Sequence, residues 1–424
     1  MKANKRILFV SFFYPPINMV ASDRIEKWIH TLTEAGHSVT LVSGGLKDLK
    51  PECLQSVTEP DRLRIIRVSF SKYLEPNYLY QKNYTFPFNI LSKFFTALLY
   101  RLFSADFGAG WLWPLSVAIK KLLQDEKYDL IISSGGPFLP FYVIRKLAIQ
   151  HGIQYILDYR DTWSETILRH TGQISIFAKW IEKVVNKDAI YITTVSEGCK
   201  AAISKHSNNQ RFKIIYNFPS IQYAQKLQVI NSTMERLLPL DKLKVVFTGS
   251  IGDFGSNRTF IPVLNAFNTL CEEERNKIVF IYCGPSSAIV KKYFAILKLE
   301  DYLLDFGMLS KQDAIGLVTK ADVCLSIIFD SKLSGNIANK GVISTKIFDY
   351  VLLNKIILNV CPDDNELHHL QKKYQLEGFY NYNGSQQEEI TLFFKQLIQG
   401  NLRGSVDNAD RLYWENQDFS FIEI

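Results

Sequence analysis

Short runs of β-branched and other apolar residues recur along this chain of 424 residues, and segments long enough for helices separate them. A run such as IVFIY at Ile278–Tyr282 is apolar throughout and does not alternate with polar residues. Strands have this composition when both of their faces are buried, as in a parallel sheet covered by helices on both sides. The pattern therefore predicts an α/β fold built on parallel sheets.

The predicted strands fall into two series, because the chain has little pattern between Pro219 and Leu243. The segment LKVVFTGS then begins a new strand–loop–helix unit, as RILFVSFFYPP does near the start of the chain. A chain of this length also exceeds what one hydrophobic core usually holds. We therefore expect one domain at residues 1–220 and a second at 221–400. The aromatic segment 401–424 follows the last predicted strand and helix, and we expect it to pack back on the first domain.

The expected strands lie at the following positions in the two series. The first series is Ile7–Val10, Val39–Val42, Ile65–Val68, Leu130–Ile132, Tyr155–Leu157, Ala189–Thr193 and Lys213–Tyr216. The second series is Val245–Phe247, Ile278–Tyr282, Leu303–Phe306, Val323–Ile327 and Lys355–Leu358.

The composition indicates a globular protein with a mild basic excess. Hydrophobic residues make up 47% of the chain and charged residues 21%, and the formal net charge is +7. The basic residues form no Lys/Arg run of the kind that binds nucleic acid, so we expect no nucleic-acid partner. The charge is compatible with anionic substrates such as nucleotide diphosphates, with an anionic membrane surface, or with a basic surface that binds neither.

The cysteines and the N-terminal residues indicate a cytoplasmic protein. The six cysteines include no Cys-x-x-Cys pair, so neither a disulfide framework nor a metal site is indicated. The chain opens with MKANKRILFV and enters a strand pattern at once, without the features of a signal peptide. The stretch closest to a membrane span, Asn89–Phe103, is interrupted by Lys93 and Arg101. It would lie either in the inner membrane surface, as an amphipathic helix, or against a domain.

Two common nucleotide-binding motifs are missing at the strand ends. SFFYPPINMV follows the first strand and TGSIGDFGSN follows the first strand of the second series, and neither fits Gly-x-Gly-x-x-Gly. No Walker A loop is present either, so dehydrogenase and ATPase activities are disfavoured. Ligands of open parallel sheets bind beyond the carboxyl ends of the strands. We therefore expect the site residues to follow the ends of the predicted strands.

In the first domain, SSGGPFLP at Ser133–Pro140 and LDYRDTWSE at Leu157–Glu165 follow strands. The glycines allow close approach of a ligand to the backbone, although a tight strand–helix turn alone would also select them. The second segment carries Asp158, Arg160, Asp161 and Glu165 beside Trp163. A carboxylate there either accepts a proton from a substrate hydroxyl or serves in a helix cap or a structural Arg–Asp pair. Arg160 and Asp161 are the candidate catalytic residues.

In the second domain, three strand ends are rich in glycine. TGSIGDFGSNRTF resembles a phosphate loop, in which Gly249, Ser250 and Arg258 would contact the phosphates. IYCGPSS and DFGMLSKQD place Gly284 and Met308 at strand tips. Such tips either admit a flat nucleobase against the backbone or are ordinary turns.

The segment NKGVISTKIFDYVLLNKIIL places polar residues at a predicted helix start. Ser344, Thr345 and Lys346 suit a diphosphate, and Asp349 about one turn later suits ribose hydroxyls. The alternative is a Ser/Thr-capped helix with an aspartate near its N-terminus, where the helix dipole favours it.

Taken in order, RILFVSFFYPP, SSGGP, LDYRDTW, TTVSEG, FTGSIG and KGVISTKIFDY resemble segments of the GT-B glycosyltransferases. Within that group they resemble the retaining family 4 enzymes that build bacterial surface polysaccharides. The resemblance covers most of the chain but poorly covers residues 70–115, where such enzymes diversify for their acceptors. It implies two Rossmann-like domains that face each other across a cleft. The C-terminal domain would hold a nucleoside-diphosphate sugar and the N-terminal domain the acceptor, with no tightly bound cofactor and no metal.

Residue by residue, the resemblance assigns Asp349 to the place of the family's second glutamate, which binds the donor ribose. The family's first glutamate, eight residues earlier, is replaced here by Gly341. The arginine that the family carries after the first strand of the second domain is Ser250 here. Arg258 is the expected substitute, and Lys346 adds further positive charge to neutralise the leaving diphosphate.

The expected activity is transfer of a glycosyl group from a nucleoside-diphosphate sugar to a hydroxyl of a glycan or lipid-linked glycan, with retention. Asp161 would orient or deprotonate the acceptor. One alternative is a GT-B sugar-nucleotide epimerase, which uses the same donor site without an acceptor. The other is a non-catalytic, membrane-associated subunit of a polysaccharide assembly complex, which Gly341 and Ser250 favour. Contact with the inner face of the cytoplasmic membrane is expected to be peripheral.

Overall fold

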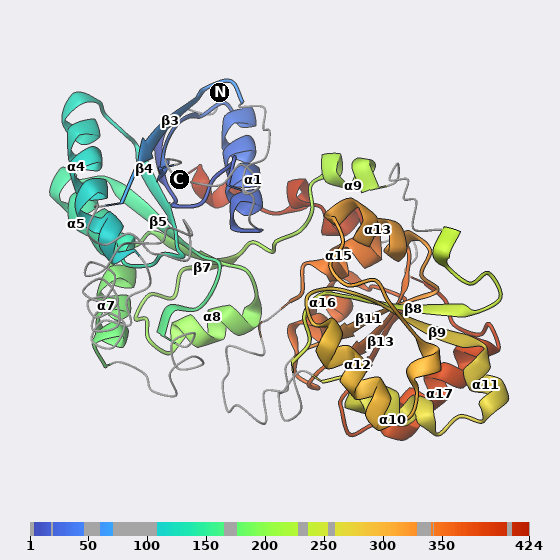
Figure 1. Cartoon of the computed structure of the whole chain (residues 1–424). Coiled ribbons are helices and arrows are strands. Elements are labelled where there is room, and N and C mark those ends of the chain that lie inside the picture. The colour runs from blue at the N-terminus through green and yellow to red at the C-terminus, as the bar shows by residue number, and fades with distance from the viewer. Residues whose placement is uncertain are drawn as a thin grey trace, which may run out of the picture. The chain divides into compact units, whose positions relative to one another are not determined.

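The computed structural model describes residues 4–17, 20–45, 60–70, 108–164, 176–227, 236–252, 259–328, 341, 343–404 and 409–423. The chain forms two compact units (Figure 1). The first consists of Met1–Tyr216 with Asp418–Ile424, and the second of Asn217–Gln417. Each unit contains one parallel sheet with helices packed on it, so the predicted α/β class is confirmed.

The sheet of the first unit has seven strands in the order β3-β2-β1-β4-β5-β6-β7, and all neighbouring pairs are parallel. All seven predicted strands of this unit are present. The strand bounds are β1 Arg6–Val10, β2 Ser38–Gly44, β3 Leu63–Val68, β4 Leu130–Ser134, β5 Gln154–Tyr159, β6 Tyr191–Thr194 and β7 Phe212–Ile214. The helix bounds are α1 Val20–Glu34, α4 Ala109–Asp125, α5 Pro140–His151, α7 Ile176–Lys187 and α8 Glu197–Ser204.

Local sequence signals explain where α5 and α8 begin and end. Helix α5 starts with Pro140, whose ring presets the helical φ, and stops at Gly152, whose φ of 65° is left-handed. Helix α8 is capped by Ser196, whose hydroxyl accepts a hydrogen bond from the amide of Cys199 at 3.0 Å. These residues set the ends of the helices that connect one parallel strand to the next.

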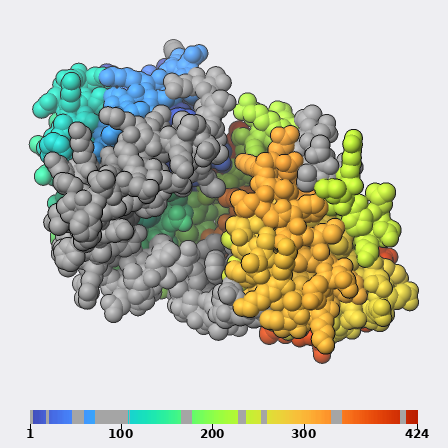
Figure 2. All heavy atoms as spheres, in the orientation of Figure 1, coloured from blue at the N-terminus to red at the C-terminus, as the bar shows by residue number. Residues whose placement is uncertain are grey.

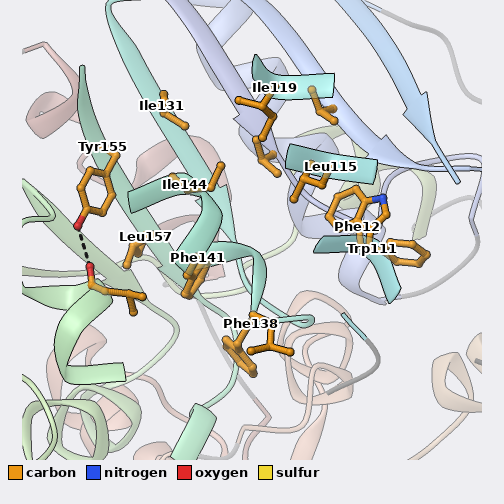
Figure 3. Packing of buried hydrophobic residues seen from close by; sticks show 14 of the residues in the cluster. Phe12, Trp111, Leu115, Ile119, Ile131, Phe138, Phe141, Ile144, Tyr155 and Leu157 are labelled. Atoms are coloured by element: carbon orange, nitrogen blue, oxygen red, sulfur yellow. Dashed lines mark hydrogen bonds between the residues drawn. The ribbon is translucent and has the colours of Figure 1, made fainter. Parts of the chain in front are cut away.

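Helices α4 and α5 bury apolar stripes against the strands (Figure 3). The spacing of three or four residues puts each stripe on one side of its helix. The indole Nε1 of Trp111 also donates to the carbonyl of Val68 at 2.8 Å, and the Tyr155 hydroxyl donates to the carbonyl of Val185 at 2.8 Å. The labelled helix residues in this core are Trp111, Leu115, Ile119, Phe141 and Ile144.

The last residues of the chain complete the first unit. The ring of Phe419 lies 5.1 Å from that of Trp28 on α1, and the ring of Phe421 lies 5.4 Å from that of Tyr191. The ammonium group of Lys5 donates to the carbonyl of Ile422 at 3.0 Å. Phe419 and Phe421 therefore cover apolar surface beside α1 and β6, whereas residues 401–417, with Tyr413 and Trp414, belong to the second unit and not to the first as expected.

The second unit contains a six-stranded parallel sheet in the order β10-β9-β8-β11-β12-β13. All five predicted strands of this unit are present. The strand bounds are β8 Leu243–Thr248, β9 Ile278–Cys283, β10 Leu303–Asp305, β11 Val323–Ile327, β12 Ile356–Val360 and β13 Phe379–Tyr382. The helix bounds are α9 Ile221–Leu227, α10 Ile261–Asn268, α11 Glu272–Asn276, α12 Ser287–Ile296, α13 Lys311–Thr319, α15 Lys346–Leu352, α16 Glu366–Tyr374 and α17 Gln387–Ile398.

Strand β13 was not predicted. It is an edge strand of four residues, FYNY, paired only with β12, and three of its residues are partly exposed. Its Asn381 interrupts the apolar run, so the rule that found strands with both faces buried does not detect it. In the part of the chain that the structure describes, no helix has the length and apolar character that crossing a membrane requires.

Candidate functional site

The loop after β8 is held by a lysine from α15. The ammonium group of Lys346 donates to the carbonyl of Thr248 at 2.7 Å. Gly249 follows with φ +121°, and a Cβ at this position would lie 2.3 Å from the Lys346 Nζ atom. The backbone conformation therefore favours glycine here, and a larger residue would also displace the end of the lysine side chain. The arrangement puts a positive charge against the backbone at the carboxyl end of β8.

The loops after β8 and β9 are joined by a tyrosine hydroxyl. Tyr282 donates to the carbonyl of Gly249 at 2.7 Å and accepts from the amide of Ser286 at 2.8 Å. Burial raises the pKa of Tyr282, so its hydroxyl keeps the proton that it donates. A Cβ at Gly284 would lie 2.3 Å from the Gly249 carbonyl oxygen, so the two backbones approach closely. Ser286 adds hydrogen bonds to both backbone groups of Ile251, each at 3.2 Å.

Helix α15 begins at Lys346, as the sequence indicated, but its N-terminus differs from the expected cap. Thr345 occupies the N-cap position with helical dihedral angles and makes no side-chain capping bond. Its side chain is exposed, and that of Ser344 is partly exposed. The helix is instead fastened to β8 through the hydroxyls of Tyr350 and Thr248, which lie 3.1 Å apart. The side chains of Ser344 and Thr345 therefore do not cap this helix.

Asp349 lies on α15 in a partly buried position. Burial raises the pKa of Asp349 to about 6, although a hydrogen bond from Tyr223 and the charges of Lys311 and Lys346 oppose the rise. The Lys311 Nζ atom also lies 5.0 Å from the centre of the Tyr223 ring. At neutral pH this carboxyl group is ionised and accepts hydrogen bonds, which suits it to vicinal hydroxyls.

Sequence reasoning missed Tyr223 on α9 and Lys311 on α13. Tyr223 lies in the weakly patterned stretch between the two strand series, and Lys311 lies just inside a helix capped by Ser310. Tyr223 carries no motif, whereas Lys311 belongs to the DFGMLSKQD segment in which only Met308 was singled out. The fold places both residues beside Asp349.

The tips after β9 and β10 are ordered turns. The Gly284 amide donates to the Gly307 carbonyl at 2.8 Å, and Gly307 has φ +63°. Asp305 accepts from the Gly307 amide at 2.9 Å and from the Ser287 hydroxyl at 3.0 Å. The side chain of Met308 is 71% exposed at this tip. Gly284 and Met308 therefore lie on hydrogen-bonded turns, and Met308 offers an apolar surface to solvent.

In the first unit, Asp158 is part of a buried ion pair. Its carboxylate forms an ion pair with the guanidinium of Arg24 at 2.6 Å. It also accepts hydrogen bonds from the hydroxyls of Thr193 at 2.7 Å and Ser134 at 2.8 Å. Burial alone would raise the pKa of Asp158, but Arg24 and the two hydroxyls hold it below its ordinary value. Arg24 also donates to the carbonyl of Ile215 at 2.8 Å. This carboxylate is saturated with partners and ties α1 to the strands, so its role is structural.

Arg160 and Asp161, the predicted catalytic pair, have different surroundings. The Arg160 Nε atom donates to the carbonyl of Gly135 at 3.1 Å, and its guanidinium lies 5.5 Å from the centre of the Phe13 ring. A Cβ at Gly136, which has φ +84°, would lie 2.4 Å from the Arg160 Nη2 atom. The side chain of Asp161 is exposed. Arg160 thus braces the SSGGP segment, and Asp161 is the accessible carboxylate of this strand end.

The remaining candidates divide between described and undescribed positions. Ser250 is exposed and Gly341 is buried. Arg258 and Glu165 lie outside the described residues. Among the residues that the structure does describe, no group of three or more His, Cys, Asp or Glu side chains is placed to hold a metal ion.

Comparison with protein families and solved structures gives consistent findings. Residues 24–220 match the model of Glycosyltransferase Family 4. Comparison with curated protein sequences gives no match. Solved structures match nearly the whole chain at low sequence identity.

Sucrose-phosphate synthase from Thermosynechococcus elongatus is 14% identical, with a TM-score of 0.59 over 98% of this chain and 92% of its own. Anabaena HepE in complex with UDP and glucose is 12% identical, with a TM-score of 0.58 over 97% of each chain. The lipopolysaccharide outer core galactosyltransferase WaaB is 12% identical, with a TM-score of 0.58 over 98% of this chain and 99% of its own. The two parallel sheets described above are the fold that these structures share. This protein is therefore a glycosyltransferase of the GT-B fold, and its residues 24–220 form a glycosyltransferase family 4 domain.

Proposed function

We propose that the protein transfers a glycosyl group from a nucleoside-diphosphate sugar to a hydroxyl of a glycan or lipid-linked glycan, with retention, in surface polysaccharide synthesis. The observation that carries the proposal is the placement of Lys346 against the loop after β8, with Asp349 on the same helix. The resemblance of HepE, solved with UDP and glucose, supports a donor of this class.

The donor is assigned to the second unit. Lys346 donates a hydrogen bond to the Thr248 carbonyl, and its ammonium group brings a positive charge that suits an anionic phosphate. Ser344 and Thr345 offer hydroxyls close by, and Arg258 is assigned to the same diphosphate. Asp349 accepts hydrogen bonds from the ribose hydroxyls. Ser250, Gly249, Gly284 and Met308 complete the proposed donor site at the ends of β8, β9 and β10.

The acceptor is assigned to the first unit, where Asp161 is the proposed catalytic residue and Arg160 braces the adjoining loop. Orienting a hydroxyl, or taking its proton as the new bond forms, depends on where the Asp161 carboxylate lies relative to the acceptor. In the transfer, the bond from the anomeric carbon to the diphosphate oxygen breaks, and its electron pair leaves with the diphosphate. The acceptor oxygen bonds to the anomeric carbon and gives its proton to Asp161.

Positive charge at the donor site stabilises the leaving diphosphate. The charge on this group grows as the glycosidic bond to phosphate lengthens, and Lys346 is held in position before the reaction. This is electrostatic stabilisation without reorganisation, which contributes most in a site that excludes water. We place the reaction in the cytoplasm, at the inner membrane surface when the acceptor is lipid-linked.

The test is a thermal-shift panel with UDP, GDP, ADP and CMP on the full-length protein. A nucleotide at ~100 times its dissociation constant adds about 2.7 kcal/mol of stability to the folded state. We expect one nucleoside diphosphate to raise the Tm, and we expect Asp349→Asn to abolish the rise. Asp301→Asn is the matched control, because this exposed carboxylate lies in the same unit, on the short helix Glu300–Tyr302.

The outcomes separate this proposal from its alternatives. If no nucleotide shifts a folded sample, the non-catalytic subunit of an assembly complex is favoured. If the nucleotide binds and the sugar nucleotide is converted without any glycan present, an epimerase is favoured. Transfer that requires an added acceptor supports the glycosyltransferase assignment.

A further inference from the structure

Helix α7 carries two buried polar side chains one turn apart. Glu182 is 1% exposed and Asn186 is 0% exposed. Residues four apart on a helix lie on the same side of it, so these two side chains face the same neighbouring part of the first unit. Burial of a carboxyl group and a carboxamide is costly unless hydrogen bonds compensate it. Their hydrogen-bond partners therefore indicate what this side of α7 does.

Both side chains bind residues 159–164, which run from the end of β5 past Asp161. The Tyr159 hydroxyl donates to the Asn186 Oδ1 atom at 2.8 Å. The Ser164 hydroxyl donates to the Glu182 Oε2 atom, and the Ser164 amide donates to the same oxygen at 3.3 Å. Helix α7 thus holds both the first and the last residue of this segment.

The hydroxyl of Tyr159 keeps the proton that it donates to Asn186. Burial raises the pKa of Tyr159 well above its ordinary value, and the nearby charge of Glu182 raises it further. The hydrogen bond between Tyr159 and α7 therefore does not depend on pH near neutrality.

The aromatic rings of the segment are also packed. The ring of Phe138 stacks on that of Tyr159 at 5.6 Å and on that of Trp163 at 5.7 Å, measured between ring centres. Residues 162–164 are buried. Of the six residues in the segment, all of which the structure describes, Asp161 alone has an exposed side chain. The packing and the bonds to α7 fix the segment and leave this carboxylate accessible.

We propose that Glu182 and Asn186 are positioning residues for glycosyl transfer, which hold residues 159–164 so that the Asp161 carboxylate meets the acceptor hydroxyl at a fixed position. The inference rests on the proposed function, in which Asp161 orients or deprotonates the acceptor. A carboxylate that is held in place before the acceptor binds needs no further ordering during the reaction. A displacement of about 1 Å in such a group can lower the rate about 100-fold.

The test removes one hydroxyl at a time from the full-length protein. Tyr159→Phe and Ser164→Ala each break one hydroxyl bond between the segment and α7. Tyr155→Phe is the matched control, because the Tyr155 hydroxyl also joins β5 to α7, through the Val185 carbonyl at 2.8 Å, but lies outside the segment (Figure 3). The probes are UDP-glucose, UDP-galactose and GDP-mannose, with lipid-linked saccharides extracted from bacterial membranes as the acceptor.

The segment variants should lose turnover and keep donor binding. We expect Tyr159→Phe and Ser164→Ala each to lower kcat for transfer by ~10-fold, and the double variant to lower it by ~100-fold. The KM for the donor and the nucleotide-induced thermal shift should not change, because the donor is assigned to the second unit. Tyr155→Phe should keep the kcat of the parent to within about twofold. Melting curves give the folded fraction of each variant, so kcat refers to folded protein.

A double-mutant cycle separates positioning from a purely structural role. If the segment acts through Asp161, Tyr159→Phe should lower kcat in the parent but not in Asp161→Asn, since coupled residues are not additive. A purely structural role would give the same loss in both backgrounds. Asp125→Asn is the matched background, because this exposed carboxylate ends α4, part of which is visible at the surface of the first unit in Figure 2. There Tyr159→Phe should lower kcat as it does in the parent.

The outcomes distinguish this inference from the proposed function. A parent protein that turns over none of the sugar nucleotides overturns the proposed function, and the inference with it. A parent that transfers sugar overturns the inference alone if the segment variants are as active as Tyr155→Phe. Equal losses from Tyr159→Phe in the parent and in Asp161→Asn also overturn it. If the double variant does not fold, the two single variants decide.

Discussion

The ammonium group of Lys346 lies 2.7 Å from the carbonyl oxygen of Thr248, although the two residues are 98 positions apart in the chain. This hydrogen bond joins the N-terminus of α15 to the end of β8. It also leaves a positive charge beside Gly249, where a Cβ would lie 2.3 Å from the Lys346 Nζ atom.

Substitution of Gly249 should lower the unfolding free energy more than substitution of a glycine whose added Cβ would meet no neighbouring atom. Gly249→Ala imposes φ +121° on a residue with a Cβ and places that Cβ 2.3 Å from the Lys346 Nζ atom. We expect a loss of about 2–3 kcal/mol of unfolding free energy, measured by urea denaturation. Gly400→Ala is the control, because Gly400 also has positive φ but nothing within 4 Å of the Cβ. Equal losses in the two variants would refute the steric role of Lys346.

Removing the charge of Lys346 should affect ligand binding more than folding. Lys346→Met loses one hydrogen bond to a carbonyl, which costs about 1 kcal/mol of stability. It also removes the charge proposed to bind the diphosphate, so the thermal shift with the preferred nucleotide should disappear. Lys372→Met, at an exposed position on α16, should keep the full shift. A Lys346→Met protein that retains the shift would show that the diphosphate lies elsewhere.

The hydroxyl of Tyr282 should contribute more to the unfolding free energy than the hydroxyl of Tyr350. Tyr282→Phe leaves two backbone groups without their partner, the Gly249 carbonyl and the Ser286 amide. We expect it to lower the unfolding free energy by about 2 kcal/mol, since unpaired buried polar groups cost about 1–3 kcal/mol. Tyr350→Phe removes only the contact with the Thr248 hydroxyl and should cost about half as much. The same urea titrations measure both, and the reverse order would contradict the bridging role of Tyr282.

Asp349 should make folding stability fall as the pH rises. Burial raises its pKa from 3.8 to about 6, so between these values the folded protein binds more protons than the unfolded chain. Stability then declines from about pH 4 to pH 6, and the cost of ionisation reaches roughly 2–3 kcal/mol above that range. Asp349→Asn should remove this decline. We expect it to be more stable than the parent at pH 7.5 and equally stable at pH 4, by urea denaturation at each pH. A parent-minus-variant difference that does not change with pH would contradict the assignment.

Substitutions of Asp158 near the end of β5 and of Asp161 just after it should have opposite effects. Asp158→Asn leaves Arg24 buried without its carboxylate and should cost about 3–5 kcal/mol of stability. Asp161→Asn changes an exposed side chain and should alter stability by less than about 0.5 kcal/mol. If Asp161 assists the acceptor, this second variant should still bind nucleotide but lose transfer activity by about 100-fold or more. Normal transfer by Asp161→Asn would remove it from the proposed mechanism.

Much of the fold was predictable, because a strand that is buried on both faces is apolar at nearly every position. Ile278–Tyr282 is apolar at every position and forms β9. The edge strand β13 was missed because Asn381, which is partly exposed, breaks its apolar run. The site was harder to predict, because clustering in the sequence does not distinguish a buried carboxylate from an accessible one. Asp158 and Asp161 are three residues apart, yet one is buried against Arg24 and the other faces solvent.

The hydrophobic pattern was enough to predict two series of buried strands, and with them an α/β fold of two parallel sheets, because hydrophobic patterning is a local property. It also located the strand ends where polar and glycine residues gather. The partners of those residues are visible only in the folded chain: Arg24 for Asp158, Lys346 for the loop at Gly249, and Tyr223 with Lys311 for Asp349. Hydrogen bonds and ion pairs form only between groups a few ångströms apart in space. Their partners come from distant parts of the chain, which only folding brings together.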